Sequence, residues 1–86
     1  MKTGWLYDYN YGSWFYLNPN GTMKTGWLYD YSYGNWFYLN PNGTMKTGWL
    51  NDGGTWYYLY SNGVMAHSTW INKYYVNESG AWIRTR

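Results

Sequence analysis

Residues 1–22 read MKTGWLYDYNYGSWFYLNPNGT, and residues 23–44 read MKTGWLYDYSYGNWFYLNPNGT. The two blocks differ only at their tenth and thirteenth positions. A third block, MKTGWLNDGGTWYYLYSNGV at residues 45–64, is two residues shorter, and the missing pair falls between its two Trp residues. Residues 65–86, MAHSTWINKYYVNESGAWIRTR, keep part of the pattern. The chain therefore consists of about four repeats, and the last one is predicted to be a degenerate terminal cap.

The local signals within each block favour β-strands. Short aromatic runs alternate with Gly, Asn, Asp and Pro, and no stretch reaches the roughly 10–12 residues of a helix. Strands are predicted at about residues 3–7 and 13–17. Asn-Asp-Gly-Gly at residues 51–54 suits a tight hairpin turn, because these residues accept positive φ. Asn-Pro-Asn-Gly at residues 18–21 turns the chain towards the next hairpin.

Each block is thus predicted to be one β-hairpin with a connector. A single two-stranded hairpin is marginal in water, so these hairpins are expected to stack on their neighbours. The predicted fold is all-β, a solenoid of stacked hairpins that forms one module over residues 1–86. A period of two places Trp14 and Tyr16 on one face of the hairpin, and Phe15 and Leu17 on the other.

Composition excludes several functional classes. The chain has no Cys and one His, so neither disulfides nor a metal cluster is expected. A net charge of +2 is too weak a field for a nucleic-acid partner. No apolar run approaches the roughly 20 residues needed for membrane insertion. The start of the chain lacks an apolar signal core, so we expect that an export signal and a partner domain were removed or never present.

Catalytic residues are also not expected. The four acids, Asp8, Asp30, Asp52 and Glu78, fall at turn-like positions in separate blocks, where they cannot easily meet. His67 is the only imidazole and lies in the degenerate block. We therefore predict a non-catalytic protein that uses no cofactor.

Aromatic residues are the recurrent chemical feature. Eight Trp, thirteen Tyr and two Phe make up 27% of the chain, and each of the first three blocks has two Trp, a Tyr in its second strand and a Met that opens the next block. Trp is favoured where a flat π face meets a cation or a sugar ring. A quaternary ammonium has no proton to donate, so a cage of π faces closed by a thioether suits it. The rings could instead only pack the solenoid.

The motifs GWL…WFYLNPNGTMKTGW and GWLNDGGTWYYLYSNGVM resemble choline-binding repeats, the cell-wall-attachment modules of pneumococcal-type surface proteins, autolysins and phage lysins. The resemblance covers the first three blocks closely and the fourth in part. It implies a left-handed solenoid with choline held between neighbouring hairpins. It also implies an extracellular, cell-surface location, with choline-bearing teichoic or lipoteichoic acid as the partner.

The same resemblance implies three ligand sites, each with two Trp, a Tyr of the following block and a Met. The third site departs from the pattern, since Lys73 stands where the following Trp would be. The implied choline-binding residues are Trp5, Trp14, Tyr38 and Met23; Trp27, Trp36, Tyr58 and Met45; and Trp49, Trp56, Tyr75 and Met65.

Other functions remain open on the residues alone. Related aromatic repeats hold glucans and other carbohydrates, and near-identical hairpins could serve a structural role by joining molecules end to end into homo-oligomers. The Tyr-rich loops at residues 7–11 and 29–33 are longer than a compact hairpin turn. Their rings could extend a binding face or cover the apolar edge of a stacked hairpin.

Overall fold

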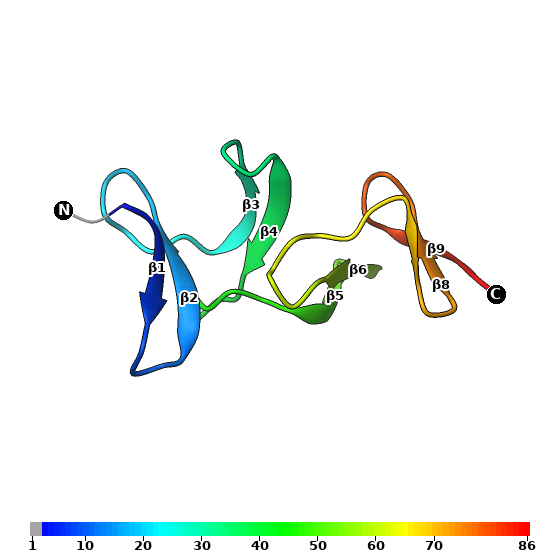
Figure 1. The fold of residues 1–86 in the computed structure, drawn as a ribbon, viewed down its shortest axis with the longest axis horizontal. Helices are drawn as coiled ribbons and strands as arrows, with labels where there is room; N and C mark the ends of the chain where they lie inside the picture. Colours follow the sequence, from blue (N-terminus) through cyan, green and yellow to red (C-terminus); the bar gives the residue numbers. More distant parts are fainter. Residues whose placement is uncertain (1–2) are drawn as a thin grey trace. The chain divides into compact units, whose positions relative to one another are not determined.

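The computed structural model of the chain describes residues 3–86. These residues form β-strands and no helix, which confirms the all-β prediction, and they include no helix that could cross a membrane. Figure 1 shows the strands along the chain. The strands are β1 Gly4–Asp8, β2 Ser13–Leu17, β3 Gly26–Asp30, β4 Asn35–Leu39, β5 Gly48–Asp52, β6 Thr55–Leu59, β7 Thr69–Ile71, β8 Tyr74–Val76 and β9 Trp82–Thr85.

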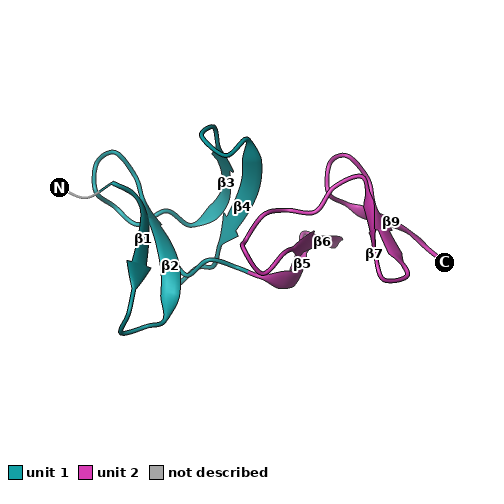
Figure 2. Cartoon of the chain, in the orientation of Figure 1, with its two compact units in different colours: residues 1–46 teal, residues 47–86 magenta. Residues whose placement is uncertain are grey.

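The chain divides into two compact units, Met1–Lys46 and Thr47–Arg86 (Figure 2). The first unit holds the antiparallel hairpins β1-β2 and β3-β4. The second holds the hairpin β5-β6 and a three-stranded sheet in the order β7-β8-β9. Repeated hairpins are therefore present as predicted, whereas the left-handed superhelix and the single module over all 86 residues stay predictions.

The hairpin loops follow from their length. Asp52 pairs with Thr55, so the turn of β5-β6 is the dipeptide Gly53-Gly54, with φ of 61° and 89°. Two positive φ angles are the signature of the type I′ turn that matches strand twist. In β1-β2 the strands end at Asp8 and Ser13 and leave a four-residue loop between them. Asp8 thus belongs to β1, one residue beyond the predicted strand end. Asn51 and Asp52, which were predicted to lie in the turn, belong to β5, so the turn is two residues shorter than predicted.

Each hairpin has two chemically different faces. In β1-β2, Trp5 pairs with Tyr16 and Leu6 pairs with Phe15, and directly opposed side chains lie on the same face. This register confirms the predicted period of two. We name the two faces by their residues: the tryptophan face holds Trp5, Tyr7, Trp14 and Tyr16, and the leucine face holds Leu6, Phe15 and Leu17.

Within each unit, the tryptophan face of one hairpin packs on the leucine face of the next. In the first unit, the ring centroid of Trp5 lies 5.0 Å from that of Phe37, and the Trp5 indole N–H donates to Asp30 Oδ2 at 2.7 Å. In the second unit, the Trp49 ring lies 5.5 Å from the Tyr74 ring. The apolar side of the following hairpin is therefore buried, with Phe37 only 4% exposed.

The connectors tie each hairpin to the next. Backbone bridges pair Leu17 with Met23 and Leu59 with Met65. The side chain of Met23 packs against Gly43, and that of Met65 packs against Gly80, in positions that a Cβ atom would occupy. A glycine is therefore required there for space as well as for its positive φ.

Residues 65–86, predicted to form a degenerate cap, include a strand that the sequence analysis did not predict. Strand β9 pairs with β8, with a register irregularity at Tyr75 and Val76. The two-residue connection of β7-β8 places Asn72 at φ 54°, a conformation that Asn tolerates better than most residues. The C-terminal strand β9 therefore extends the last hairpin to a three-stranded sheet.

Candidate functional site

The second unit has a hollow of about 320 Å³ lined by four aromatic side chains, Trp49, Trp56, Tyr74 and Trp82. Its volume falls at the lower end of the roughly 300–1,000 Å³ that is typical of small-molecule pockets. Trp56 remains 39% exposed, so the hollow opens to solvent.

Four different strands, β5, β6, β8 and β9, place these rings. Trp49 and Trp56 both lie on the tryptophan face of β5-β6, because Trp49 pairs with Tyr58 and Asn51 pairs with Trp56. Tyr74 comes from the next hairpin, where it pairs with Ile71 on the equivalent of the leucine face. The hollow is therefore formed where two hairpins meet.

Trp82 closes the hollow from the C-terminal strand. Its ring meets Tyr74 edge to face, with centroids 5.6 Å apart and an interplanar angle of 88°. Its indole N–H donates to the backbone carbonyl of Arg84 at 3.0 Å and to Thr85 Oγ1 at 3.1 Å. The polar atom of Trp82 is thus already bonded, and the side chain contributes π surface to the hollow.

The lining determines what this hollow can bind. All four lining residues are aromatic, and no carboxylate or ammonium group is among them. Such surfaces attract a cation through the ring quadrupoles, or an apolar group through contact area. One cation already lies close by, since Lys73 Nζ is 5.6 Å from the centroid of the Tyr74 ring. The rings are therefore suited to a soft cation and offer little to a hydrogen-bonding ligand.

The residues predicted for the third site occupy different places. Trp49 and Trp56 line the hollow as expected. The residue that joins them is Tyr74, whereas Tyr75 packs on Trp70 with centroids 5.1 Å apart. Met65 is 6% exposed and packs against the connector glycine, so its thioether is not among the lining groups.

The residues predicted for the first site show the same shift by one position. Trp5 and Trp14 lie together, with centroids 6.4 Å apart and rings nearly perpendicular. The ring that reaches Trp5 from the next hairpin is Phe37, while Tyr38 packs on Trp27 of its own hairpin at 5.1 Å. Because hairpins stack front to back, the contacting ring comes from the leucine face of the second hairpin.

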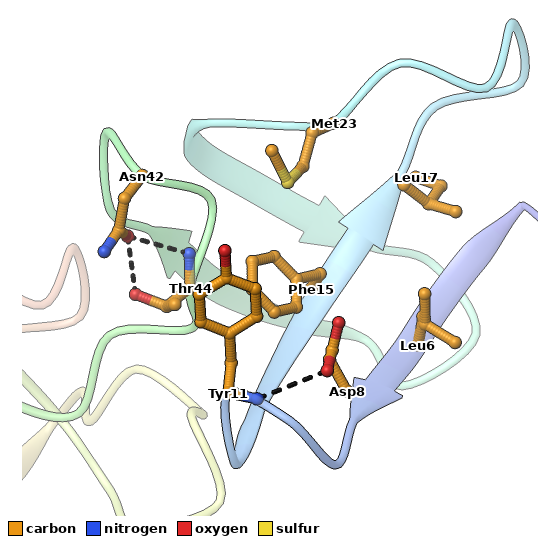
Figure 3. A pocket seen from close by; sticks show the side chains of 8 residues that line it. All are labelled: Leu6, Asp8, Tyr11, Phe15, Leu17, Met23, Asn42 and Thr44. Atoms are coloured by element: carbon orange, nitrogen blue, oxygen red, sulfur yellow. Dashed lines mark hydrogen bonds between the residues drawn. The ribbon is translucent and has the colours of Figure 1, made fainter.

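The methionine of the first site lies on the other side of its hairpin. Met23 is half exposed and lines a second hollow together with Leu6, Phe15 and Leu17 of the leucine face (Figure 3). The alternation of a strand puts these groups opposite Trp14. Met23 and the tryptophan pair of β1-β2 therefore serve different surfaces.

The residues predicted for the second site belong to both units. Trp27 and Trp36 of the first unit have centroids 6.3 Å apart. Met45, in the same unit, donates its backbone N–H to the carbonyl of Trp14 at 2.8 Å. Tyr58 lies in the second unit, where its ring packs on Trp49 at 5.0 Å. A ligand site formed by this set stays a prediction.

The loop tyrosines divide between the two roles that the sequence left open. Tyr11 packs on Phe15 with centroids 5.7 Å apart and so covers the leucine face. Tyr9 contacts Tyr7 at 4.9 Å but is 89% exposed. The second hairpin repeats both arrangements.

Residues 3–86 contain no group of three or more metal-ligating side chains.

Sequence comparison gives a clear family match. The family model for the choline-binding, cell wall binding repeat matches residues 3–23, 25–45 and 47–65. A search of curated proteins gives no significant match.

Solved structures match over nearly the whole chain. Choline binding protein F from Streptococcus pneumoniae, solved in the presence of a peptidoglycan analogue, is 48% identical with a TM-score of 0.87 over 98% of this chain and 27% of that one. The choline binding domain of Spr1274 from the same species is 43% identical with a TM-score of 0.88 over 96% of both chains. The endolysin of phage Cp-1, solved with choline, is 31% identical with a TM-score of 0.78 over 94% of this chain and 24% of that one. This chain thus spans about a quarter of the length of choline binding protein F.

Proposed function

Because the chain belongs to the choline-binding family of cell wall binding repeats, we propose that it is a non-catalytic module that holds choline in aromatic cages. Choline displayed on teichoic or lipoteichoic acid is its ligand, and the module attaches its protein to a bacterial cell surface. The relatives are choline binding proteins of Streptococcus pneumoniae and a lysin solved with choline, which supports this location and ligand.

The observation that carries the proposal is the hollow with four aromatic walls. A trimethylammonium group presents methyl groups with a diffuse positive charge and has no hydrogen to donate. Four rings can contact it from several sides, and each cation–π contact contributes roughly 0.5–2 kcal/mol. Hydrated Lys or primary amines lose hydrogen bonds to water in such a hollow and regain none. The hollow therefore selects a quaternary ammonium over other cations.

The residues proposed to bind choline in the second unit are Trp49, Trp56, Tyr74 and Trp82, with Tyr74 in the role expected for Tyr75. Choline sites at the tryptophan pairs of the first two hairpins stay part of the proposal, with Trp5, Trp14, Trp27 and Trp36 as their tryptophans.

Affinity for a single choline is expected to be modest. The cation–π gain, less the cost of association, leaves about −4 kcal/mol, which corresponds to a Kd near 1 mM. Several sites on one polymer raise the effective affinity, because each binding event after the first is intramolecular. Firm attachment to a choline-bearing polymer then does not require a tight individual site.

The carbohydrate alternative fits this hollow less well. A sugar needs several convergent hydrogen-bond donors and acceptors beside its aromatic platform. The lining consists of four rings. Among them, Trp82 already donates its indole N–H to Arg84 and Thr85 of its own strand.

The test compares two teichoic acids that carry either phosphocholine or phosphoethanolamine and otherwise have the same backbone. Both head groups carry one ammonium cation beside the same phosphate, but only the choline nitrogen is methylated. We expect the chain to sediment with the phosphocholine polymer and to be released by free choline in the millimolar range, about the single-site Kd. Equal binding to both polymers would show attraction to charge or to the polymer backbone and would contradict the proposal.

A further inference from the structure

The positive charge of the chain is confined to its last block. Residues 1–64 hold three Lys and three Asp, so their formal charges cancel. Residues 65–86 hold one Glu and three cations, Lys73, Arg84 and Arg86, which account for the whole net charge of +2. The same block supplies Tyr74 and Trp82 to the hollow of the second unit. Because like charges repel, a cation beside this hollow disfavours a bare quaternary ammonium, unless the ligand also carries an anion.

Lys73 contacts a ring of that hollow. It stands where the repeat has its second Trp, since Lys73-Tyr74-Tyr75 corresponds to Trp56-Tyr57-Tyr58. Lys73 lies in the two-residue connection between β7 and β8. Its Nζ is 5.6 Å from the centroid of the Tyr74 ring, which lines the hollow. Lys73 itself is not a lining residue, so its ammonium group lies at the rim.

The two arginines are held on the other face of the last sheet. Tyr75 pairs with Trp70 on one side and with Arg84 on the other, so these three side chains share a face. The Arg84 guanidinium lies 5.9 Å from the centroid of Tyr75. The Arg86 guanidinium lies 4.6 Å from the centroid of Trp70 and donates to the carbonyl of Asn72 at 3.1 Å. Neither ring lines the hollow, so Lys73 is the cation of this block that is placed to act on its ligand.

The Lys73 ammonium group has no carboxylate partner among residues 3–86. The side chain is exposed, and the lining of the hollow contains no carboxylate. Its charge therefore acts on whatever occupies the hollow. It repels a trimethylammonium group and attracts an anionic group beside it. The sign of this charge favours a ligand that carries an anion a few bonds away from its quaternary nitrogen.

We propose that Lys73 is a specificity-determining residue, which binds the phosphate of a phosphocholine ester while the trimethylammonium group lies on the four rings. Two carbons and one oxygen separate the nitrogen from the phosphorus in such an ester. The phosphate of a ligand bound in the hollow therefore stays at the rim, where the Lys73 ammonium group lies. The inference rests on the proposed function and specifies the form of choline that this site prefers, the phosphate ester over free choline.

The expected contribution of Lys73 is modest. An ammonium group is a compact charge that binds phosphate oxygens. Because Lys73 is exposed, water and salt screen the pair, and the gain is about threefold in affinity. The rings select the methylated nitrogen, and Lys73 adds a preference for the esterified form.

The test titrates the full chain with choline and with glycerophosphocholine, a phosphate diester of choline that carries one negative charge. The indole N–H signals of Trp56 and Trp82 report binding at this hollow and not at other sites. Lys73→Gln should weaken the binding of glycerophosphocholine about threefold. It should not weaken the binding of choline, which has no group that Lys73 attracts. Lys73→Arg keeps the charge and should bind the diester as the unchanged chain does.

The matched control is Arg84→Gln, which removes the same charge from the same block but from the face of Tyr75. It should leave both affinities unchanged. Equal weakening of both ligands by Lys73→Gln would show that Lys73 only supports the Tyr74 ring. An unweakened diester, or an equal effect of Arg84→Gln, would likewise overturn the role of Lys73. Each of these results leaves choline binding in place, whereas no binding of either ligand to the unchanged chain would contradict the proposed function as well.

Discussion

Replacing Tyr74 by Leu should weaken choline binding at the hollow of the second unit. Tyr74 is one of four lining rings and lies 5.5 Å from Trp49 and 5.6 Å from Trp82. Leu retains apolar volume but has no π face, so the expected loss is one cation–π contact, about 1 kcal/mol, or about fivefold in Kd. The assay follows the indole N–H signals of Trp56 and Trp82 by NMR during a choline titration, which isolates this site from the others.

The matched control is Tyr75→Leu in the same strand. Tyr75 also packs on a tryptophan ring, at 5.1 Å from Trp70, so its variant likewise loses a contact between a tyrosine and a tryptophan. Tyr75 does not line the hollow, and its variant should bind choline at this site with unchanged affinity. If Tyr75→Leu weakened choline binding and Tyr74→Leu did not, the assignment of the third ring to Tyr74 would be refuted.

Two further predictions concern stability and are measured by urea unfolding. Gly80→Ala should lower the free energy of unfolding by about 2 kcal/mol, and Gly54→Ala should lower it by about 1 kcal/mol. Both glycines have φ near +90°, but only a Cβ at position 80 would meet the buried thioether of Met65. Equal losses in the two variants would contradict that contact. Asp30→Asn should lower the free energy of unfolding by about 1–2 kcal/mol, because it removes the charge that receives the Trp5 indole N–H. Asp8→Asn should lower the free energy of unfolding by less than Asp30→Asn does. The reverse order would contradict the hydrogen bond from the Trp5 indole to Asp30.

The hairpins could be predicted because the chain repeats. Two nearly identical blocks show the same order of strand and turn signals twice, and the shorter third block places its length difference in a turn. Some of the strand ends themselves differ from the predicted ones by one or two residues. The alternation of Trp14 and Phe15 then predicts two distinct faces, which the strand register confirms. Local pattern and turn chemistry are therefore sufficient to predict the hairpins and their two faces.

Which residues meet between hairpins could not be predicted in the same way. The family resemblance implies Tyr38 and Tyr75 as ligand-site residues, whereas the rings that reach the preceding tryptophans are Phe37 and Tyr74. A shift of one residue in a strand moves a side chain to the other face. Only the stacking direction decides between them, and the pattern within one repeat does not contain that direction.

The contribution of Trp82 was missed for a different reason. Residues 65–86 depart from the repeat, so comparison with the other blocks gave no expectation of a strand after Gly80. The signal that was available is the alternation of Trp82-Ile83-Arg84-Thr85, which directly follows a turn glycine. A ring at the first position of that strand could have been considered a wall of the last site.

The most direct test of a cation-selective aromatic cage is calorimetric titration of the full chain with choline, beside 3,3-dimethylbutanol. The alcohol has the same shape as choline, with carbon in place of the charged nitrogen. We expect saturable choline binding with a Kd near 1 mM, little response to the alcohol, and a stoichiometry that counts the occupied cages. Equal binding of both compounds, or no choline binding up to tens of millimolar, a range set by that affinity, would contradict the central claim.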